Sequence, residues 1–458
     1  MPQGSFTMKR LFLLAAMASA ASLNAQEPGR IPFESYTLDN GLQVVLSENH
    51  TAQVVTVNVW YDVGSRNERA GRTGFAHLFE HMMFQGSANV KKAEYFQLIE
   101  RTGGGLNGST QPDRTNYYQT LPSNRLNLGL WLEADRMRSL AITDSNLTNQ
   151  TETVKEERRL KVDNQPYGAA IFEGPQQLFD PAGCFAYSHS IIGSMADLNS
   201  ASVDDVKDFF TLYYAPNNAT LVVTGDLNPA AARQLIQQYF GDIPRAPEPP
   251  PVECRQAFNT GPLKQRVLDI NANLPGVFLM YRTPAEDHAD TPAIGLLGIL
   301  LGQGESSRLN QKLVREAKAA VAAQAVAGIF GPRRGPNFFL TYAIANQGVL
   351  PDSLDLLLSS EMARLADGGI TEEELTKAKN SYRSIAIRTR QTSMDIAENL
   401  QYATLFLGST EAVNTDFARY MAVTRDDLIR VARIYFRADN SLTLIVSSEA
   451  AAPAGATP

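Results

Sequence analysis

The chemistry in this sequence concentrates in one short segment, Gly74–Phe84, in which His77, Glu80 and His81 form the pattern H-x-x-E-H. Residues four apart lie on one face of an α-helix, so both imidazoles can face a single metal ion. Neutral imidazole is a good zinc ligand, and zinc lowers the pKa of a water that it binds to about 7. A carboxylate beside such a water can take its proton. The segment therefore predicts a zinc site with Glu80 as the general base.

Chance is the first alternative explanation for this motif. The chain has only five histidines, and a random H-x-x-E-H is expected in roughly a few chains per thousand of this composition, so the false-positive risk is small. The competing structure is an amphipathic helix with two partly buried, hydrogen-bonded histidines. Elsewhere, His189 belongs to no ligand spacing, and we expect it to be a surface histidine or one satisfied by hydrogen bonds.

A catalytic zinc usually has three protein ligands, and a charged helix predicted at residues 146–162 can supply the third. In this helix Gln150, Val154 and Glu157 recur at i, i+4 and i+7 and so share one face. Glu156 and Glu157 are both candidate ligands. A charge run is usually a solvent-exposed face, and that alternative applies to both carboxylates.

A glycine-rich segment that follows the motif helix has small polar residues at its end. Three glycines at residues 103–105 allow another backbone to approach closely. The segment is either a flexible hairpin loop or an edge strand that accepts an extended peptide by strand addition. In the second case the substrate-binding residues are Asn107, Gly108, Ser109 and Thr110.

The domain organisation follows from a linker and a repeat. The proline-rich residues 246–258 predict a semi-rigid linker. Residues 203–214 match residues 425–436 at a constant offset of 222, and an apolar strand follows each copy. We therefore predict an α+β chain of two similar tandem domains, residues 26–245 and 259–448, each a mainly antiparallel sheet packed with helices. The H-x-x-E-H motif occurs in the first domain, and the second has no zinc ligands.

Composition limits the location and the partners of the chain. The net charge of -7 over 458 residues gives no electrostatic reason to expect nucleic acid or an anionic membrane. A basic start, an apolar run and a small-residue cleavage point predict a signal peptide at residues 1–25. No later run is long and apolar enough for a transmembrane anchor. We expect a periplasmic or secreted protein with a disordered tail at residues 449–458; whether Met1 or Met8 is the true start stays open.

The two cysteines, Cys184 and Cys254, have neither the spacing of a metal site nor that of a catalytic nucleophile. In an oxidising compartment they can pair. Two unpaired thiols are an equal alternative, because the sequence does not give the distance between them.

Taken together, these segments resemble the M16 metallopeptidase family (pitrilysin/insulinase, inverzincin), and most of all its short bacterial, processing-peptidase-like branch. The resemblance covers residues 32–448. It implies the LuxS/MPP-like fold and a zinc endopeptidase of short or unfolded peptides, with Zn2+ as cofactor. It also implies that Glu157, with Glu156 as the rival, joins His77 and His81 as a ligand, and that the strand at Asn107 holds the substrate backbone. The resemblance depends on the H-x-x-E-H motif, residues 107–110, the carboxylate helix, Tyr214-x-Pro216-Asn217-Asn218-Ala219 and Gly304-x-Ser306-Ser307-Arg308-Leu309.

Two positions depart from the pattern of this family. Gln150 stands where the family has a second glutamate, so it can support the site by hydrogen bonding but brings no charge. Active members use an arginine and a tyrosine seven residues apart; here Arg315 is present, but Ala322 replaces the tyrosine and cannot donate a hydrogen bond to an oxyanion. The resemblance therefore implies a heterodimer in which a second M16-like chain supplies the Arg/Tyr pair. The alternative function is a non-catalytic M16-like peptide-binding or assembly subunit.

Overall fold

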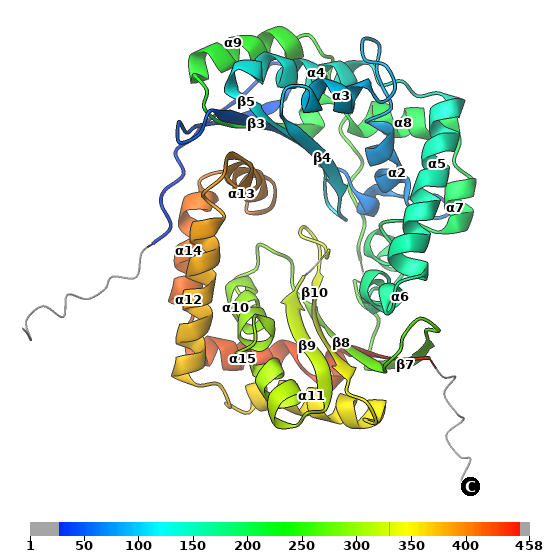
Figure 1. Cartoon of the computed structure of the whole chain (residues 1–458), viewed down its shortest axis with the longest axis vertical. Coiled ribbons are helices and arrows are strands. Elements are labelled where there is room, and N and C mark those ends of the chain that lie inside the picture. The colour runs from blue at the N-terminus through cyan, green and yellow to red at the C-terminus, as the bar shows by residue number, and fades with distance from the viewer. Residues whose placement is uncertain (1–26, 256, 329, 449–458) are drawn as a thin grey trace, which may run out of the picture.

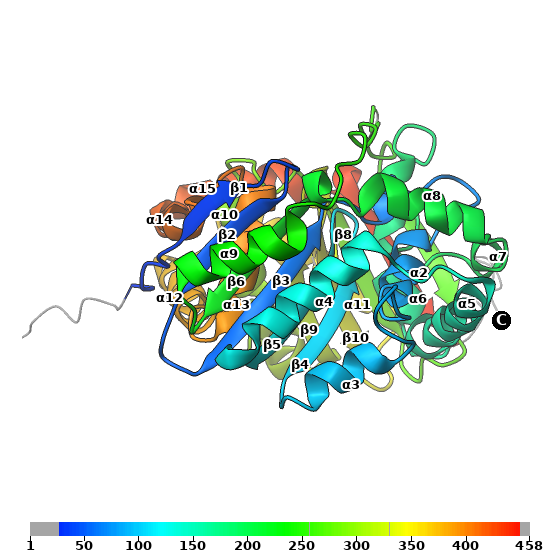
Figure 2. The same ribbon diagram turned by 90° about the horizontal axis from the view of Figure 1, so that it is seen from above.

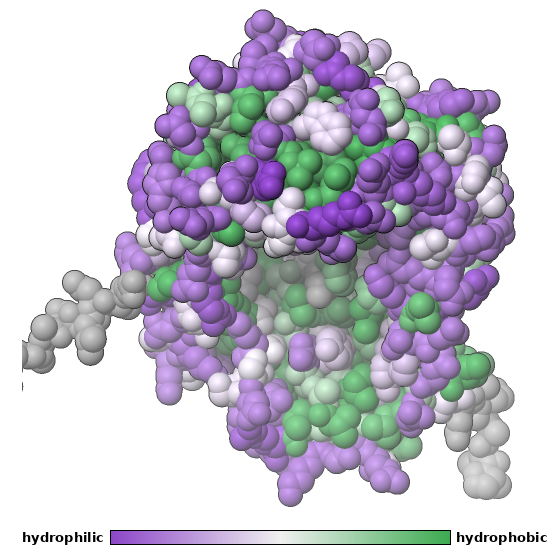
Figure 3. Space-filling model, turned by 45° about the horizontal axis from the view of Figure 1, so that its top comes forward, coloured by the Kyte–Doolittle hydropathy of each residue, from purple (hydrophilic) through white to green (hydrophobic). Residues whose placement is uncertain are grey.

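The computed structural model describes residues 27–255, 257–328 and 330–448. The predicted signal peptide and C-terminal tail lie outside the described residues. Two β-sheets lie one above the other in Figure 1, and Figure 3 shows that the surface between them is hollowed, with hydrophobic residues on the lower wall. Among the described residues, no helix combines the length and the apolar character that a membrane span requires.

The first sheet has six strands in the order β1-β2-β6-β3-β5-β4. Strands β2 and β6 run parallel, and the other neighbouring pairs are antiparallel. Helices α4 and α9 cross the outer face of this sheet (Figure 2). Because β4 is the last strand in the order, the glycine-rich segment forms an edge strand, as one of the two sequence interpretations predicts. The strands are β1 Glu34–Thr37, β2 Gln43–Glu48, β3 Val54–Tyr61, β4 Gly105–Thr110, β5 Thr115–Pro122 and β6 Ala219–Gly225.

The second sheet repeats this arrangement with five strands in the order β7-β11-β8-β10-β9, and its β7–β11 pair is again parallel. Helix α8 (Val203–Tyr213) and strand β6 recur as α15 (Arg425–Tyr435) and β11 at the predicted offset. The α+β fold of two similar domains is therefore confirmed, with one parallel strand pair in each sheet. The strands are β7 Leu263–Leu268, β8 Gly276–Thr283, β9 Ala320–Ala327, β10 Asn337–Ala345 and β11 Ser441–Ser447.

Helices cover both sheets and connect the two halves. Their amphipathic spacing places apolar residues in two main cores, each between one sheet and helices that pack on it. The remaining helices are α2 Phe75–Met82, α3 Glu94–Glu100, α4 Leu126–Arg138, α5 Asp144–Arg158, α6 Gly168–Phe172, α7 Met195–Asn199, α9 Pro229–Phe240, α10 Thr291–Gly302, α11 Pro351–Ala366, α12 Glu372–Arg388, α13 Ser393–Phe406 and α14 Ala412–Ala422.

Helix α13, from the second half of the chain, lies beneath the first sheet, on the side away from α4 and α9 (Figure 1). Its buried residues Ile396 and Leu400 pack with Val45 and Val222 of that sheet. Its Glu398 accepts hydrogen bonds from the amides of Asn58 and Asn116, at 2.7 and 3.1 Å. The first sheet thus depends on the second half for one of its two covers.

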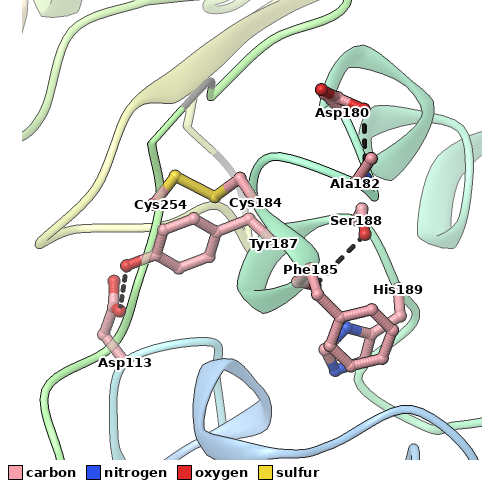
Figure 4. Close-up of a disulfide and its surroundings, with 9 residues drawn as sticks. All are labelled: Asp113, Asp180, Ala182, Cys184, Phe185, Tyr187, Ser188, His189 and Cys254. Atoms are coloured by element: carbon pink, nitrogen blue, oxygen red, sulfur yellow. Dashed lines mark hydrogen bonds between the residues drawn. A yellow bond between two sulfur atoms is a disulfide. The ribbon is translucent and has the colours of Figure 1, made fainter.

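Conversely, residues from the first half of the chain pack on the second sheet. Leu178 and Phe179 of the first half are buried with Phe278 and Met280 of β8. A disulfide between Cys184 and Cys254 then fixes the end of this segment to the predicted linker (Figure 4). The structure thereby decides between the two alternatives for the cysteines in favour of the pair.

Candidate metal centre

Helix α2 carries the H-x-x-E-H motif and is fixed by an apolar stripe on its other side. The helix packs against α5, and His77 and His81 face that neighbour across the contact. The stripe has the i, i+3, i+4, i+7 spacing of a helix with one buried face. Its residues are Phe75, Leu78, Phe79 and Met82.

The two histidines meet the carboxylate of Glu157 on α5. Glu157 Oε2 lies 3.6 Å from His77 Nε2 and 3.2 Å from His81 Nε2. The ligand atoms of the three residues all lie within 4.8 Å of one another, and they form the one such group among the described residues. Donor atoms around a tetrahedral zinc, at bond lengths of about 2.0–2.2 Å, stand roughly 3.3 Å apart. The three side chains therefore fit the protein ligand set of a catalytic zinc.

Two of these three groups, His77 and Glu157, are already in the protonation state that a metal ligand needs. Burial, and then the neighbouring His81, lower the pKa of His77 to about 4, so its imidazole is neutral near neutral pH. Burial opposes ionisation of Glu157, but its hydrogen bond with His81 and the charge of His77 lower its pKa to about 2. Burial also lowers the pKa of His81, yet its hydrogen bond to Glu157 outweighs that effect and raises the pKa. A metal ion would therefore displace a proton held between His81 and Glu157.

Outer contacts orient two of the three candidate ligands. His81 Nδ1 lies 3.3 Å from Gln150 Oε1, which leaves Nε2 pointing at Glu157. Lys161 Nζ donates a 2.6 Å hydrogen bond to Glu157 Oε1. The predicted helix over 146–162 ends sooner than expected, because residues Arg159–Asp163 form a π-helical turn that closes with a bond from Asn164 N–H to Arg159 O. Such turns often occur beside functional sites.

Glu80 lies between the metal ligands and the edge strand β4. Thr110 of that strand donates a 2.6 Å hydrogen bond from Oγ1 to Glu80 Oε2. Burial raises the pKa of Glu80, while the Thr110 hydrogen bond opposes the rise, so the group is a stronger base than an exposed glutamate. A Cβ atom at Gly108 would lie 3.2 Å from Glu80 Cγ, so the glycine lets the strand approach this carboxylate.

The other predicted substrate residues lie along β4. The Gly108 N–H donates to Asn107 Oδ1 at 2.9 Å, and the Ser109 carbonyl accepts a 2.7 Å bond from the Arg114 guanidinium. Gly108, Ser109 and Thr110 line a cavity of about 230 Å³ together with His77, Glu80 and Glu157. The structure thus brings Glu80, the predicted ligands and three of the four predicted strand residues to one place, whereas Asn107 does not line the cavity.

Four residues considered from the sequence do not join this group. Glu156 points away, pairs with Arg159 and has 58% of its side chain exposed. Arg315 pairs with Glu305 at the surface, and Ala322 lies in β9; neither lines the cavity. His189 is not at the surface but buried, and both of its ring nitrogens have hydrogen-bonding partners.

The second half of the chain contributes two side chains to the cavity, Phe330 and Phe338. The Phe330 ring lies 5.7 Å from the ring of Phe172 on α6, so the apolar wall is built from both halves. Sequence reasoning missed these phenylalanines and Lys161. The i, i+4 spacing of Lys161 from Glu157 could have indicated the lysine, but no local pattern indicated the phenylalanines.

Comparison with known proteins agrees with this fold. The model of insulinase (peptidase family M16) matches residues 43–173, and the model of the peptidase M16 inactive domain matches residues 200–382. The chain belongs to the M16 peptidase family. It is 33% identical over 451 residues to the zinc protease PqqE of Helicobacter pylori, covering 96% of this chain and 99% of that protein.

A plant relative and two solved structures are also similar to this chain. The chain is 23% identical to a probable mitochondrial-processing peptidase subunit beta of Arabidopsis thaliana, over 87% of this chain and 75% of that protein. A crystal structure of a protease from Helicobacter pylori superposes with a TM-score of 0.85 at 30% identity, covering 91% of this chain and all of that one. The first half of the periplasmic protease PqqL from Escherichia coli shares the fold, with a TM-score of 0.73 at 19% identity over 92% of this chain and 93% of that one.

Proposed function

We propose that this chain is a zinc-dependent endopeptidase that cleaves short or unfolded peptides. The observation that carries the proposal is the meeting of His77, His81 and Glu157 around one point, beside Glu80 and a free sheet edge. In this proposal residues 26–245 form the zinc-binding domain, residues 246–258 the linker, and residues 259–448 the domain without zinc ligands.

The chemistry divides between the metal and the chain. Zinc supplies Lewis acidity, which lowers the pKa of water and polarises a carbonyl. The Glu80 carboxylate takes a proton from the attacking water and returns one to the leaving amine. The free edge of β4, at Asn107 to Thr110, aligns the peptide backbone by strand addition. The apolar wall at Phe172, Phe330 and Phe338 gives room for a hydrophobic side chain of the substrate.

Zinc analysis tests the metal site directly. We expect about one zinc per purified wild-type chain and a loss of zinc in His77→Ala and in His81→Ala, because each removes one of three ligands. His50→Ala is the matched control, since His50 is exposed and pairs with Glu48 and Asp226 away from α2. Wild-type protein that holds no zinc after dialysis against a zinc buffer would contradict the proposal. Zinc without hydrolysis of any unfolded peptide, even with a second M16-like chain present, would favour the non-catalytic subunit.

A partner chain is the second part of the proposal. The cavity lining contains no arginine or tyrosine among the described residues, and its cation, Lys161, is already bonded to Glu157. The group that stabilises the oxyanion is therefore expected from a second M16-like chain. The disulfide and the predicted signal peptide support a periplasmic or secreted location for this assembly.

Isolation from the periplasm or the culture medium of the native host tests the partner. We expect a second M16-like chain with an intact Arg/Tyr pair to co-purify, and peptide hydrolysis to rise by about 10²-fold or more when the two chains are mixed, the size expected for an oxyanion donor. The matched control is the same partner chain with its tyrosine changed to phenylalanine, which removes the donor. A single chain that hydrolyses peptides at the full rate of the mixture would show that no partner is needed.

A further inference from the structure

The first turn of α2 is bound by a buried carboxylate. Gly74 precedes the helix with a left-handed backbone (φ 83°) and no side chain to cap it. Instead, Glu68 Oε2 accepts the Gly74 N–H at 2.8 Å and Glu68 Oε1 accepts the Ala76 N–H at 2.7 Å. Amide groups in the first turn of a helix have no partner within the helix, and a carboxylate there is favoured by the helix dipole.

Glu68 is itself held by a buried histidine. Its side chain is 0% exposed, and its Oε2 lies 3.0 Å from His189 Nε2. His189 Nδ1 lies 2.8 Å from the Phe185 carbonyl, and Nε2 also lies 3.0 Å from the Ser65 carbonyl. Because every one of these partners is an acceptor, the imidazole that satisfies them donates from both nitrogens and is a cation. The cation balances a carboxylate that is otherwise expensive to bury.

The surrounding chain keeps His189 in place. The Phe185 ring stacks on the His189 ring with centroids 4.5 Å apart (Figure 4). The disulfide fixes Cys184, five residues before His189, to Cys254. On the other side, a Cβ atom at Gly193 would lie 2.5 Å from Gly74 Cα, so the segment that follows His189 rests directly on the start of α2.

The two candidate histidine ligands differ in how they are oriented. His81 Nδ1 has Gln150 as a partner, as a metal-binding histidine usually has for its second nitrogen. His77 Nδ1 is buried and has no hydrogen-bonding partner among the described residues. The direction of the His77 imidazole must therefore come from its backbone, and the residue before it, Ala76, is the one that Glu68 holds.

We propose that Glu68 and His189 are positioning residues, a buried ion pair that fixes the first turn of the zinc helix and thereby aims His77 at the metal. The inference rests on the proposed zinc site. Gln150 orients His81 by direct contact with its ring, whereas the Glu68–His189 pair orients His77 through the backbone of α2.

Metal affinity and the spectrum of the cobalt-substituted protein test this role. In the full chain, His189→Gln removes the charge but keeps one donor. We expect the zinc dissociation constant to rise about 10- to 100-fold, the effect of losing an outer partner of a metal ligand. The visible bands of Co²⁺ should shift, and kcat should fall while KM for a peptide stays within about twofold, because β4 is untouched. His50→Gln, which also breaks histidine–carboxylate pairs, should change none of these.

The outcomes separate this inference from the proposed function. If wild-type protein binds neither Zn²⁺ nor Co²⁺, the proposed function fails and the inference fails with it. If wild-type protein binds them and His189→Gln has the same affinity and spectrum, the inference alone is overturned. Should His189→Gln not fold, hydrogen exchange on wild-type protein decides: slow exchange at the Gly74 and Ala76 amides supports the pair, and rapid exchange, as at a frayed helix start, overturns it.

Discussion

Replacing Glu80 with glutamine is expected to leave about one zinc bound per chain and to lower kcat for peptide hydrolysis by about 10²- to 10⁴-fold, the range for loss of a general acid–base group. Glutamine keeps the size of the side chain and can still accept the hydrogen bond from Thr110. It cannot take a proton at neutral pH. Glu80 is not one of the three residues whose ligand atoms converge, so metal content should not change.

The measurement is zinc content together with steady-state kinetics on one unfolded peptide. Thr110→Val is the informative companion variant, because it removes the donor to Glu80 but keeps the carboxylate. It should retain much more activity than Glu80→Gln. A Glu80→Gln protein with turnover within tenfold of wild type would remove Glu80 from the role of general base. A variant that loses its zinc would instead make Glu80 a ligand.

Replacing Glu157 with glutamine should abolish tight zinc binding, whereas Glu156→Gln should leave it intact. The Glu157 carboxylate faces both imidazoles at 3.2 and 3.6 Å, and its pKa is lowered to about 2, so it is ionised near neutral pH. An amide is a far poorer ligand. Replacing a residue that only hydrogen-bonds to a metal ligand lowers metal affinity by roughly 10- to 100-fold. Replacing the ligand Glu157 should therefore lower the zinc affinity by more than that.

The pair of variants is a matched test, because both change one glutamate to glutamine on consecutive positions of α5. Glu156 pairs with Arg159 on the exposed side of the helix. Chelator competition gives the zinc affinity of each protein. Equal affinities in the two variants would contradict the assignment of Glu157, and a loss confined to Glu156→Gln would transfer the ligand role to its neighbour.

The parts of this site that were predictable are those with a helical period. The spacing of four between His77 and His81 places both on one face of a helix. The spacing of Gln150, Val154 and Glu157 likewise places these three on one face of α5. The repeated helix and strand, α8–β6 and α15–β11, were visible because both copies keep the same apolar order. Each of these signals is local, so one sequence is enough to read it.

The rest depends on contacts between residues far apart in the chain. Phe330 and Phe338 reach the cavity from the second half, and Glu68 meets His189 from 121 residues away. A single phenylalanine or a lone histidine has no periodicity that tells which distant residues it contacts, so neither could be placed. The cysteine pair stayed open for the same reason: bonding depends on the distance between the two residues in space, which the sequence does not contain.

Each half of the chain covers part of the sheet of the other half, and this has a consequence for folding during synthesis. The first sheet is built from residues up to Gly225, but the helix that closes its inner face ends at Phe406. A nascent chain therefore carries the complete H-x-x-E-H helix for some 180 residues of further translation while one face of its sheet is still bare. The candidate metal site therefore reaches its final surroundings only when almost the whole chain has been made.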